Sequence, residues 1–223
     1  VMSFSYLIQV FVIGLATGFI YYLTACGLSL IVSGMGIVNV AQGSFFILGV
    51  FLAISSFDKI GFLGCVIGVP LVVAVLAIPF ERCIRPLYGK NVFYTLLITF
   101  ALSLVVSDVT YYIWGSKHSM IPIPQVLKGS VKIASVTLPK YYLFICVVGL
   151  VIYFAYWLMM EKTKLGKLLR ANMYDREMVI ALGYNMNVLF IAMLAIAFAM
   201  SALGGVLNSG FASYDAKAAV TVF

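Results

Sequence analysis

Six long apolar segments, almost free of formal charge, constrain this chain more than any other feature of its sequence. Each is long enough to cross the roughly 30 Å hydrocarbon core of a bilayer as a helix, which takes about 20 residues. Only Asp108 places a formal charge inside one of them. Because a backbone that spans lipid must satisfy its own hydrogen bonds, the segments predict an all-α, polytopic integral membrane helix bundle with about six spanning helices, which form a single transmembrane domain over residues 1–223. The segments run approximately from Leu7 to Val32, Ile37 to Phe57, Phe62 to Phe80, Val92 to Trp114, Tyr141 to Met160 and Val188 to Phe211.

The composition excludes several classes of protein. The chain is 64% apolar and 9% charged, whereas a soluble domain is about 45–50% apolar and about 25% charged. Such a chain has too few polar side chains to cover a globule in water, which excludes a soluble enzyme, a disordered segment and a secreted disulfide scaffold. The four cysteines lie far apart without metal-ligand spacing, and we interpret them as small buried apolar residues: Cys26, Cys65, Cys83 and Cys146.

The basic residues predict the orientation of the chain. The net charge is +7, but the charges lie between the apolar segments, which favours contact with anionic lipid head groups over a nucleic-acid partner. Cytoplasmic loops hold the excess of Lys and Arg. The loops after the third and fifth segments carry eight of these residues, including all four arginines, against six on the other side. The eight are Arg82, Arg85, Lys90, Lys162, Lys164, Lys167, Arg170 and Arg176. We therefore expect those loops in the cytoplasm and the N-terminus outside.

The loop from Glu161 to Asn185 is the most informative polar stretch. Its periodicity predicts an amphipathic turn that lies on the membrane surface. Asp175 is a suitable N-cap for a short helix of about two turns, and Gly183 can take the left-handed conformation that ends it. From periodicity alone, a basic helix that only anchors the protein and a helix that docks on a partner remain equally open. Three leucines share one helical face of this loop: Leu165, Leu168 and Leu169.

A few polar side chains inside the apolar segments are candidates for a solute path or gate. Asn39 and Gln42 lie beside an expected helix break or tight turn at 33–36, where backbone groups are free. Thr99 and Ser103 belong to a ridge of hydroxyl residues that recurs every four positions along the fourth segment. Close helix packing explains the ridge better than solute contact does, whereas packing and a path or gate role are equally open for the two amides.

Several motifs resemble the permease subunits of the branched-chain amino-acid family of bacterial ABC transporters. In that family a glycine, an arginine-alanine pair, an aspartate and a further glycine recur at the spacing of Gly166, Arg170, Ala171, Asp175 and Gly183. Further matches occur in the same order as in the family. They are Gly36 to Gly43, Glu81-Arg82 with Arg85-Pro86, Thr99 with Ser103, and Ala202 to Val206.

The resemblance implies a cytoplasmic coupling segment over residues 161–185. No phosphate-binding loop of the P-loop type occurs in the sequence, so we expect ATP to bind a separate subunit and the chain itself to hold no cofactor and no metal. The implied partners are ABC ATPase subunits, a second permease subunit that is identical or homologous, and a periplasmic or extracellular solute-binding protein. The implied location is the bacterial cell inner membrane. The residues implied in coupling are Gly166, Arg170, Ala171, Asp175, Arg176 and Gly183.

The resemblance also implies a function and an extent. We expect a transport subunit, not an enzyme, for branched-chain amino acids or related small polar solutes such as urea or amides. At least two more spanning helices are expected beyond Phe223, so that the C-terminal helices are missing from this chain or the protein is unusually short. A monosaccharide-type ABC permease of the same superfamily is the alternative within transport. A membrane enzyme would show clustered titratable groups at one membrane face, and a cation channel an acidic ring or a carbonyl filter, and neither pattern occurs in the sequence.

Overall fold

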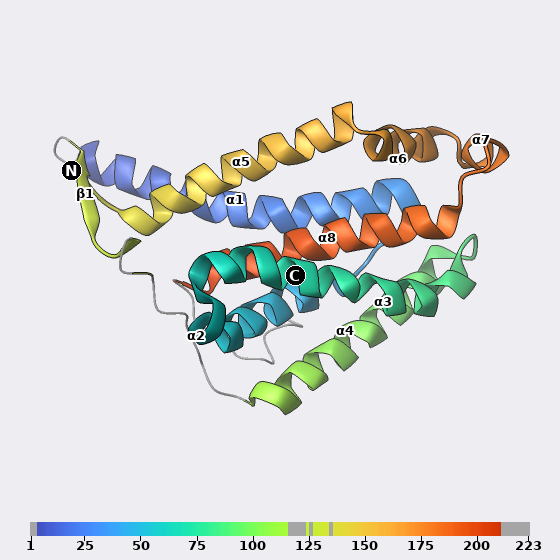
Figure 1. Ribbon diagram of the computed structural model, residues 1–223, viewed down its shortest axis with the longest axis horizontal. Helices are drawn as coiled ribbons and strands as arrows, with labels where there is room; N and C mark the ends of the chain where they lie inside the picture. Colours follow the sequence, from blue (N-terminus) through green and yellow to red (C-terminus); the bar gives the residue numbers. More distant parts are fainter. Residues whose placement is uncertain (1–3, 116–123, 125–126, 134–135, 211–223) are drawn as a thin grey trace.

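The computed structural model describes residues 4–115, 124, 127–133 and 136–210, and helices make up most of it (Figure 1). Five helices are long and apolar enough to cross a membrane, which confirms the predicted all-α membrane bundle. A short 3-10 turn, η1, covers Arg85–Leu87. The α-helices are α1 (Phe4–Met35), α2 (Gln42–Val75), α3 (Ala77–Ile84), α4 (Val92–Trp114), α5 (Lys140–Lys162), α6 (Lys164–Tyr174), α7 (Arg176–Ala181) and α8 (Met186–Asn208).

The structure has five such helices instead of about six because α2 contains both the second and the third predicted spans. The chain turns at Gly61, whose φ of 67° and ψ of 179° are not helical. The Cys65 thiol lies 3.5 Å from the Ala53 carbonyl oxygen, twelve residues earlier, whereas a straight helix would separate them by about 18 Å. α2 is therefore a hairpin of two antiparallel arms, which Figure 1 shows side by side.

The prediction that the second span begins at Ile37 is wrong, because helix α2 begins only at Gln42. Gly36 has a φ of 67°, and the residues from there to Ala41 form no regular helix: 37–39 are irregular and 40–41 make a turn. Ile37, Asn39 and Ala41 are nevertheless buried. Non-helical backbone at membrane depth requires such cover by protein. The chain therefore returns into the bundle as a non-helical segment, residues 36–41, before α2 starts.

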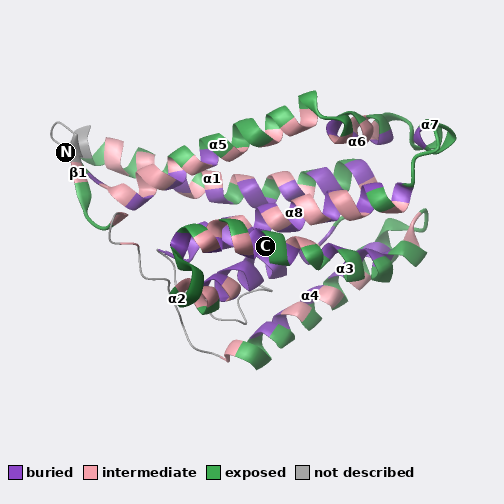
Figure 2. Ribbon diagram, in the orientation of Figure 1, coloured by how far each residue is buried: buried purple, intermediate pink, exposed green. Residues whose placement is uncertain are grey.

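α8 forms the centre of the bundle. It packs against both arms of α2 and against α1, while α4 and α5 keep broad exposed faces (Figure 2). Glycines allow the close approach of α2 and α8: a Cβ on Gly49 would lie 2.6 Å from the carbonyl oxygen of Ala202, and a Cβ on Gly205 would collide with the backbone of Phe46. The ring of Phe45 stacks on that of Phe198 at 3.7 Å between centroids. The core is thus built around the α2–α8 contact.

The predicted long connection between α4 and α5 contains a small antiparallel hairpin. Strand β1 (Ser130–Ile133) pairs with β2 (Val136–Pro139) in the register Ser130↔Pro139. This hairpin adds two short strands to the helical bundle. The rest of that connection, residues 116–123 and 125–126, lies outside the described residues, as do the Phe211 end of the last predicted span and all residues after it.

The loops gather at the two ends of the bundle. The β1–β2 hairpin and the Gly61 corner lie at one end, whereas α6, α7 and the basic loop after α3 lie together at the other (Figure 1). The two loops that the distribution of Lys and Arg predicts to be cytoplasmic thus share one end of the molecule.

Candidate coupling segment and membrane path

The predicted coupling segment, residues 161–185, starts with a sharp corner between α5 and α6. Thr163 caps α6, since its hydroxyl accepts a hydrogen bond from the Gly166 amide at 3.1 Å. Gly166 is buried, and a Cβ there would collide with the carbonyl oxygens of Met159 and Met160. Gly166 therefore lets α6 fold back tightly against the last turn of α5. Thr163 was not among the predicted caps, although Thr is a common N-cap residue.

α6 is amphipathic, as predicted. Leu169 is fully buried and Leu165 and Leu168 are half-buried, while Lys164 and Lys167 are exposed. The buried face packs against the C-terminal half of α1 and the start of α8, in a cluster with Leu30 and Met193. The helix lies on the bundle by a leucine face and keeps its lysines in solvent or at the lipid head groups.

The predicted caps of α7 are confirmed. The Asp175 carboxylate accepts a hydrogen bond from the Met178 amide at 3.0 Å. At the other end Gly183 has a φ of 83°, and its amide donates to the Ile180 carbonyl at 2.9 Å. Between the caps Val179 is fully buried. α7 is thus a short helix with a cap at each end and one side chain anchored in the bundle.

Both arginines implied in coupling make contacts within the chain. The guanidinium of Arg170 lies 2.7 Å from the Glu161 carboxylate, and that of Arg176 lies 5.2 Å from the ring centroid of Phe190. Ala171, beside Arg170, is exposed. These contacts hold the two arginines against α5 and α8.

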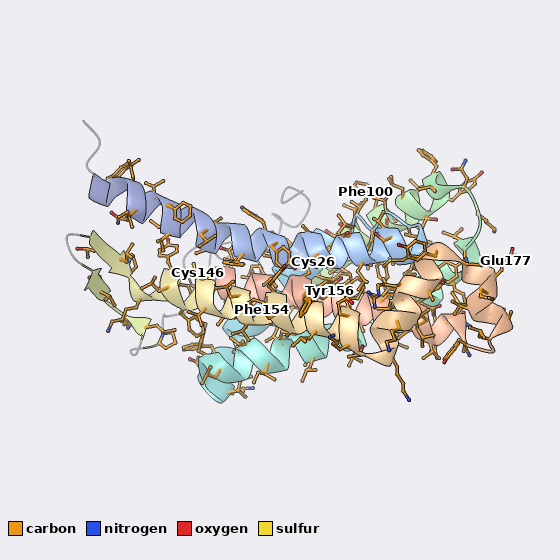
Figure 3. All side chains as sticks on the ribbon, turned by 90° about the horizontal axis from the view of Figure 1, so that it is seen from above. Cys26, Phe100, Cys146, Phe154, Tyr156 and Glu177 are labelled. Atoms are coloured by element: carbon orange, nitrogen blue, oxygen red, sulfur yellow. The ribbon has the colours of Figure 1, made fainter. Side chains whose placement is uncertain are left out.

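The exposed surface of this end is apolar as well as charged. Tyr174 is 92% exposed, Leu182 66% and Met178 59%. Figure 3 shows Glu177, also on α7, at the far edge of the molecule. The three large apolar side chains have no cover within the described residues, and they flank the short helix α7 or project from it.

An ion pair between a buried carboxylate and an exposed arginine supports the same end of the bundle. The Glu81 carboxylate is fully buried and accepts two hydrogen bonds from Arg85, at 3.0 and 2.7 Å. The Tyr88 hydroxyl donates to the same carboxylate at 3.3 Å, and its ring packs on Phe190 at 4.9 Å. Burial raises the pKa of Tyr88, and the negative charge of Glu81 raises it further. Tyr88 therefore stays a neutral donor. The i, i+4 spacing of Glu81 and Arg85 was the available sequence signal for this pair.

The hydroxyl ridge of α4 faces the non-helical segment 36–41. Thr99 Oγ1 lies 3.0 Å from the Leu96 carbonyl oxygen, 3.2 Å from that of Val38 and 3.4 Å from the Val40 amide. Ser103 Oγ lies 2.8 Å from Ser44 Oγ. α4 therefore attaches to the bundle through short polar side chains. The buried residues of α4 are Thr95, Thr99, Ser103, Ser107 and Thr110.

Asn39 and Gln42 are each only 2% exposed. In each side-chain amide, one polar atom has a hydrogen-bond partner and the other has none among the described residues. Asn39 Oδ1 accepts from the Ala41 amide at 3.1 Å, but its Nδ2 has no partner among the described residues. Gln42 Nε2 donates to the Ala197 carbonyl at 2.9 Å, but its Oε1 has no partner there. A Cβ on Gly27 would lie 2.7 Å from Gln42 Nε2, so the absence of that side chain makes room for the amide.

The structure thus groups the predicted residues into two places. Asn39, Gln42, Thr99 and Ser103 lie on or against residues 38–44, inside the bundle. The coupling residues lie at the end that carries α6 and α7. A buried polar atom without a partner in an apolar medium costs free energy, and water or a polar solute relieves that cost.

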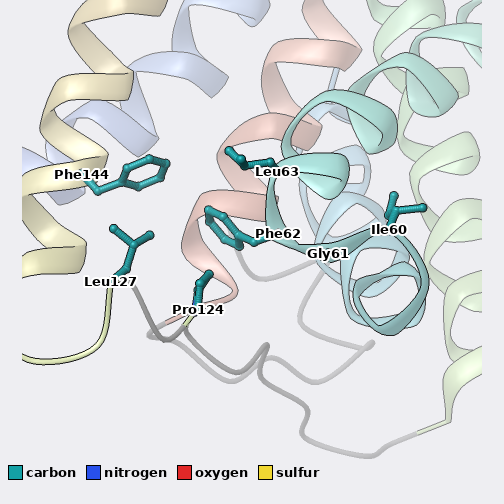
Figure 4. A pocket seen from close by; sticks show the side chains of 7 residues that line it. All are labelled: Ile60, Gly61, Phe62, Leu63, Pro124, Leu127 and Phe144. Atoms are coloured by element: carbon teal, nitrogen blue, oxygen red, sulfur yellow. The ribbon is translucent and has the colours of Figure 1, made fainter.

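A separate cavity of about 510 Å³ lies at the opposite end, beside the Gly61 corner (Figure 4). Its lining is apolar and includes Pro124, Leu127 and Phe144. None of the four candidate path residues lines it.

Comparison with known proteins gives two matches. The family described as the permease component of branched-chain amino acid transport systems matches residues 10–218. The high-affinity branched-chain amino acid transport system permease protein BraD of Pseudomonas aeruginosa is 26% identical over 215 residues, which cover 90% of this chain and 70% of that protein. No solved structure matches.

Proposed function

Since this chain belongs to the family of branched-chain amino acid transport system permeases, we propose that it moves branched-chain amino acids inward as part of an ABC importer. The chain is a multi-pass transport component of the bacterial inner membrane. ATP hydrolysis takes place on separate ATPase subunits, and a second permease subunit completes the path. The observation that supports this proposal best is α7, a six-residue helix capped at both ends and set beyond the bundle.

The ATPase contact is carried mainly by apolar side chains of the coupling segment. Tyr174, Met178 and Leu182 are exposed, whereas Arg170 and Arg176 already contact Glu161 and Phe190. Aromatic and large apolar anchors supply most of the binding energy at interfaces, and rim charges mainly set association rates. α7, anchored by Val179, sits in a groove of the ATPase and passes the movement of that subunit to the bundle.

Co-purification tests the coupling surface. We expect Leu182→Asp to lower the amount of ATPase that purifies with the tagged permease at least tenfold, because a carboxylate would have to enter an apolar groove. Lys59→Asp, an exposed change at the opposite end, should leave the yield unchanged. Equal ATPase recovery with Leu182→Asp would contradict this assignment.

The path for the solute runs along the non-helical segment 36–41 and the start of α2. Its support is the pair of unpaired polar atoms, Asn39 Nδ2 and Gln42 Oε1, one a donor and the other an acceptor. An amino acid presents a carboxylate and an ammonium group, which need one donor and one acceptor, respectively. The hydroxyls of Thr99 and Ser103 line the same segment from α4.

Uptake measurements test the path. Gln42→Leu removes the unpaired acceptor while keeping a similar volume, and we expect it to lower leucine uptake at least tenfold with the assembly intact. Gln9→Leu, the same change at a half-buried position of α1 outside the path, should transport normally. Normal uptake by Gln42→Leu would show that this amide serves in packing and does not contact the solute.

The choice of solute distinguishes the alternatives. We expect unlabelled valine or isoleucine, and not a monosaccharide or urea, to compete with leucine for uptake. A solute-binding protein delivers the solute at the end that carries the β1–β2 hairpin and the Gly61 corner. Competition by a monosaccharide alone would favour the sugar-importing alternative.

A further inference from the structure

A buried amide joins the coupling segment to the end of α1. Asn172, on α6, is 6% exposed, and its Nδ2 donates to the Gly34 carbonyl at 2.5 Å. The two residues are 138 positions apart in the sequence. This is a direct polar contact between α6 and a helix that spans the membrane.

The Gly34 carbonyl lies in the last turn of α1, where backbone carbonyls have no hydrogen-bond donor within the helix. A helix leaves its last four carbonyls without an internal partner. The usual donor to Gly34 would be the amide of Val38, but Val38 already belongs to the non-helical segment that begins at Gly36. Asn172 supplies the missing donor from another part of the chain, two residues before the backbone changes direction.

Packing leaves little freedom on either side of this hydrogen bond. A Cβ on Gly34 would collide with the end of the Met193 side chain, so this side chain of α8 fills the space beside Gly34. On the other side, α6 is fixed to α5 by the corner at Gly166 and to the bundle by buried Leu169. A displacement of α6 therefore reaches Gly34 through a short and rigid connection.

We propose that Asn172 is the positioning residue that transmits movement of α6 and α7 to the non-helical segment 36–41, and so to the path residues Asn39 and Gln42. This inference rests on the proposed function, because it assigns a mechanical link between the ATPase contact and the solute path. Asn172 touches neither the ATPase surface nor the solute. It acts through the Gly34 carbonyl.

The test compares transport with ATP hydrolysis in the same reconstituted complex. Asn172→Leu keeps a similar volume and removes the donor. We expect it to assemble with the ATPases and to hydrolyse ATP at the normal rate, while the number of leucine molecules moved per ATP falls about tenfold. Asn187→Leu, the same change at a half-buried position in the first turn of α8, should keep the normal ratio.

The outcomes separate this inference from the proposed function. A normal leucine-to-ATP ratio in Asn172→Leu would overturn the link while leaving the transport function standing. Absence of ATP-dependent leucine uptake by the unaltered complex would overturn the proposed function, and the link with it. A parallel fall of assembly, hydrolysis and transport would show a purely structural role and would also overturn the link.

A second measurement needs no substitution. Hydrogen exchange of the unaltered complex is compared with and without a nucleotide that locks the ATPases closed. We expect the exchange rates of backbone amides in residues 36–41 to change at least tenfold, while those of the β1–β2 hairpin stay the same. Unchanged exchange in residues 36–41 would contradict the link even if Asn172→Leu fails to fold.

Discussion

Gly166 shows how one missing side chain sets the position of a whole helix. Its Cα lies so close to the last carbonyls of α5 that a Cβ would collide with them. We expect Gly166→Ala to lower the free energy of unfolding by about 1–3 kcal/mol, because the corner between α5 and α6 has to open. Thermal unfolding of the purified protein measures the change.

Gly14→Ala is the matched control for that substitution. Gly14 is exposed on α1, and a Cβ there would meet nothing within 4 Å. The same change should stabilise the protein slightly, by about 0.5–1 kcal/mol, because alanine favours the helix. Equal effects of the two substitutions would contradict the close approach assigned to Gly166.

Asp175 tests the cap of α7. Asp175→Ala should cost about 1 kcal/mol of local helix stability, since the Met178 amide loses its acceptor. We expect faster hydrogen exchange at residues 176–178 and weaker association with the ATPase. Asp58→Ala, which removes an exposed carboxylate at the opposite end, should change neither quantity. Unaltered exchange and unaltered assembly in Asp175→Ala would count against the coupling role of α7.

At the residue scale, the sequence predicts what depends on near neighbours. Asp175 and Gly183 cap a helix of six residues, so their roles follow from local spacing. The hydrogen bond from Asn172 to Gly34 and the collision that Gly166 avoids depend on how helices meet. No local pattern encodes those contacts. Burial of Glu81 is an intermediate case, since its spacing from Arg85 indicates the pair but not its burial.

At the scale of elements, α4 docks on the bundle through hydroxyl groups. Thr99→Val removes the hydroxyl that bonds to the non-helical segment 36–41 while keeping the shape of the side chain. We expect a loss of about 1–2 kcal/mol in stability, because the Val38 carbonyl and the Val40 amide lose a buried partner. Denaturant unfolding in detergent measures the loss.

Thr110→Val separates docking from helix propensity. The Thr110 hydroxyl donates only within α4, to the Val106 carbonyl at 2.7 Å. The same substitution should therefore cost less than Thr99→Val, by about 1 kcal/mol. Equal costs at the two positions would mean that the ridge serves α4 alone and does not hold it to residues 36–41.

Hydropathy predicts the helices of this chain better than it predicts their ends. Residues 37–41 are as apolar as a helix start, so composition alone places them in the second span. What decides their structure is that Gly36 turns the chain while Asn39, Thr99 and Gln42 supply side-chain bonds beside it. Gly61 marks the turn of α2 in the sequence, but only packing shows that the two arms lie antiparallel.

At the scale of the whole molecule, the account requires one orientation in the membrane. We expect the end with α6 and α7 to face the cytoplasm, where ATP is available, and the Gly61 corner to face outward. We expect a membrane-impermeant maleimide to label Lys59→Cys in intact cells and Lys90→Cys only in inverted vesicles. The unaltered chain gives the background from its four native cysteines. The reverse labelling pattern would contradict the placement of the coupling segment.

The central claim is that an ATPase drives solute through this chain by acting on α6 and α7. The most direct measurement is leucine uptake into proteoliposomes that hold the permease complex, with solute-binding protein on one side and ATP on the other. We predict accumulation against a gradient only when both the ATPase subunits and ATP are present, and its loss with Leu182→Asp. Equal accumulation by the permease without ATPase subunits would contradict the account.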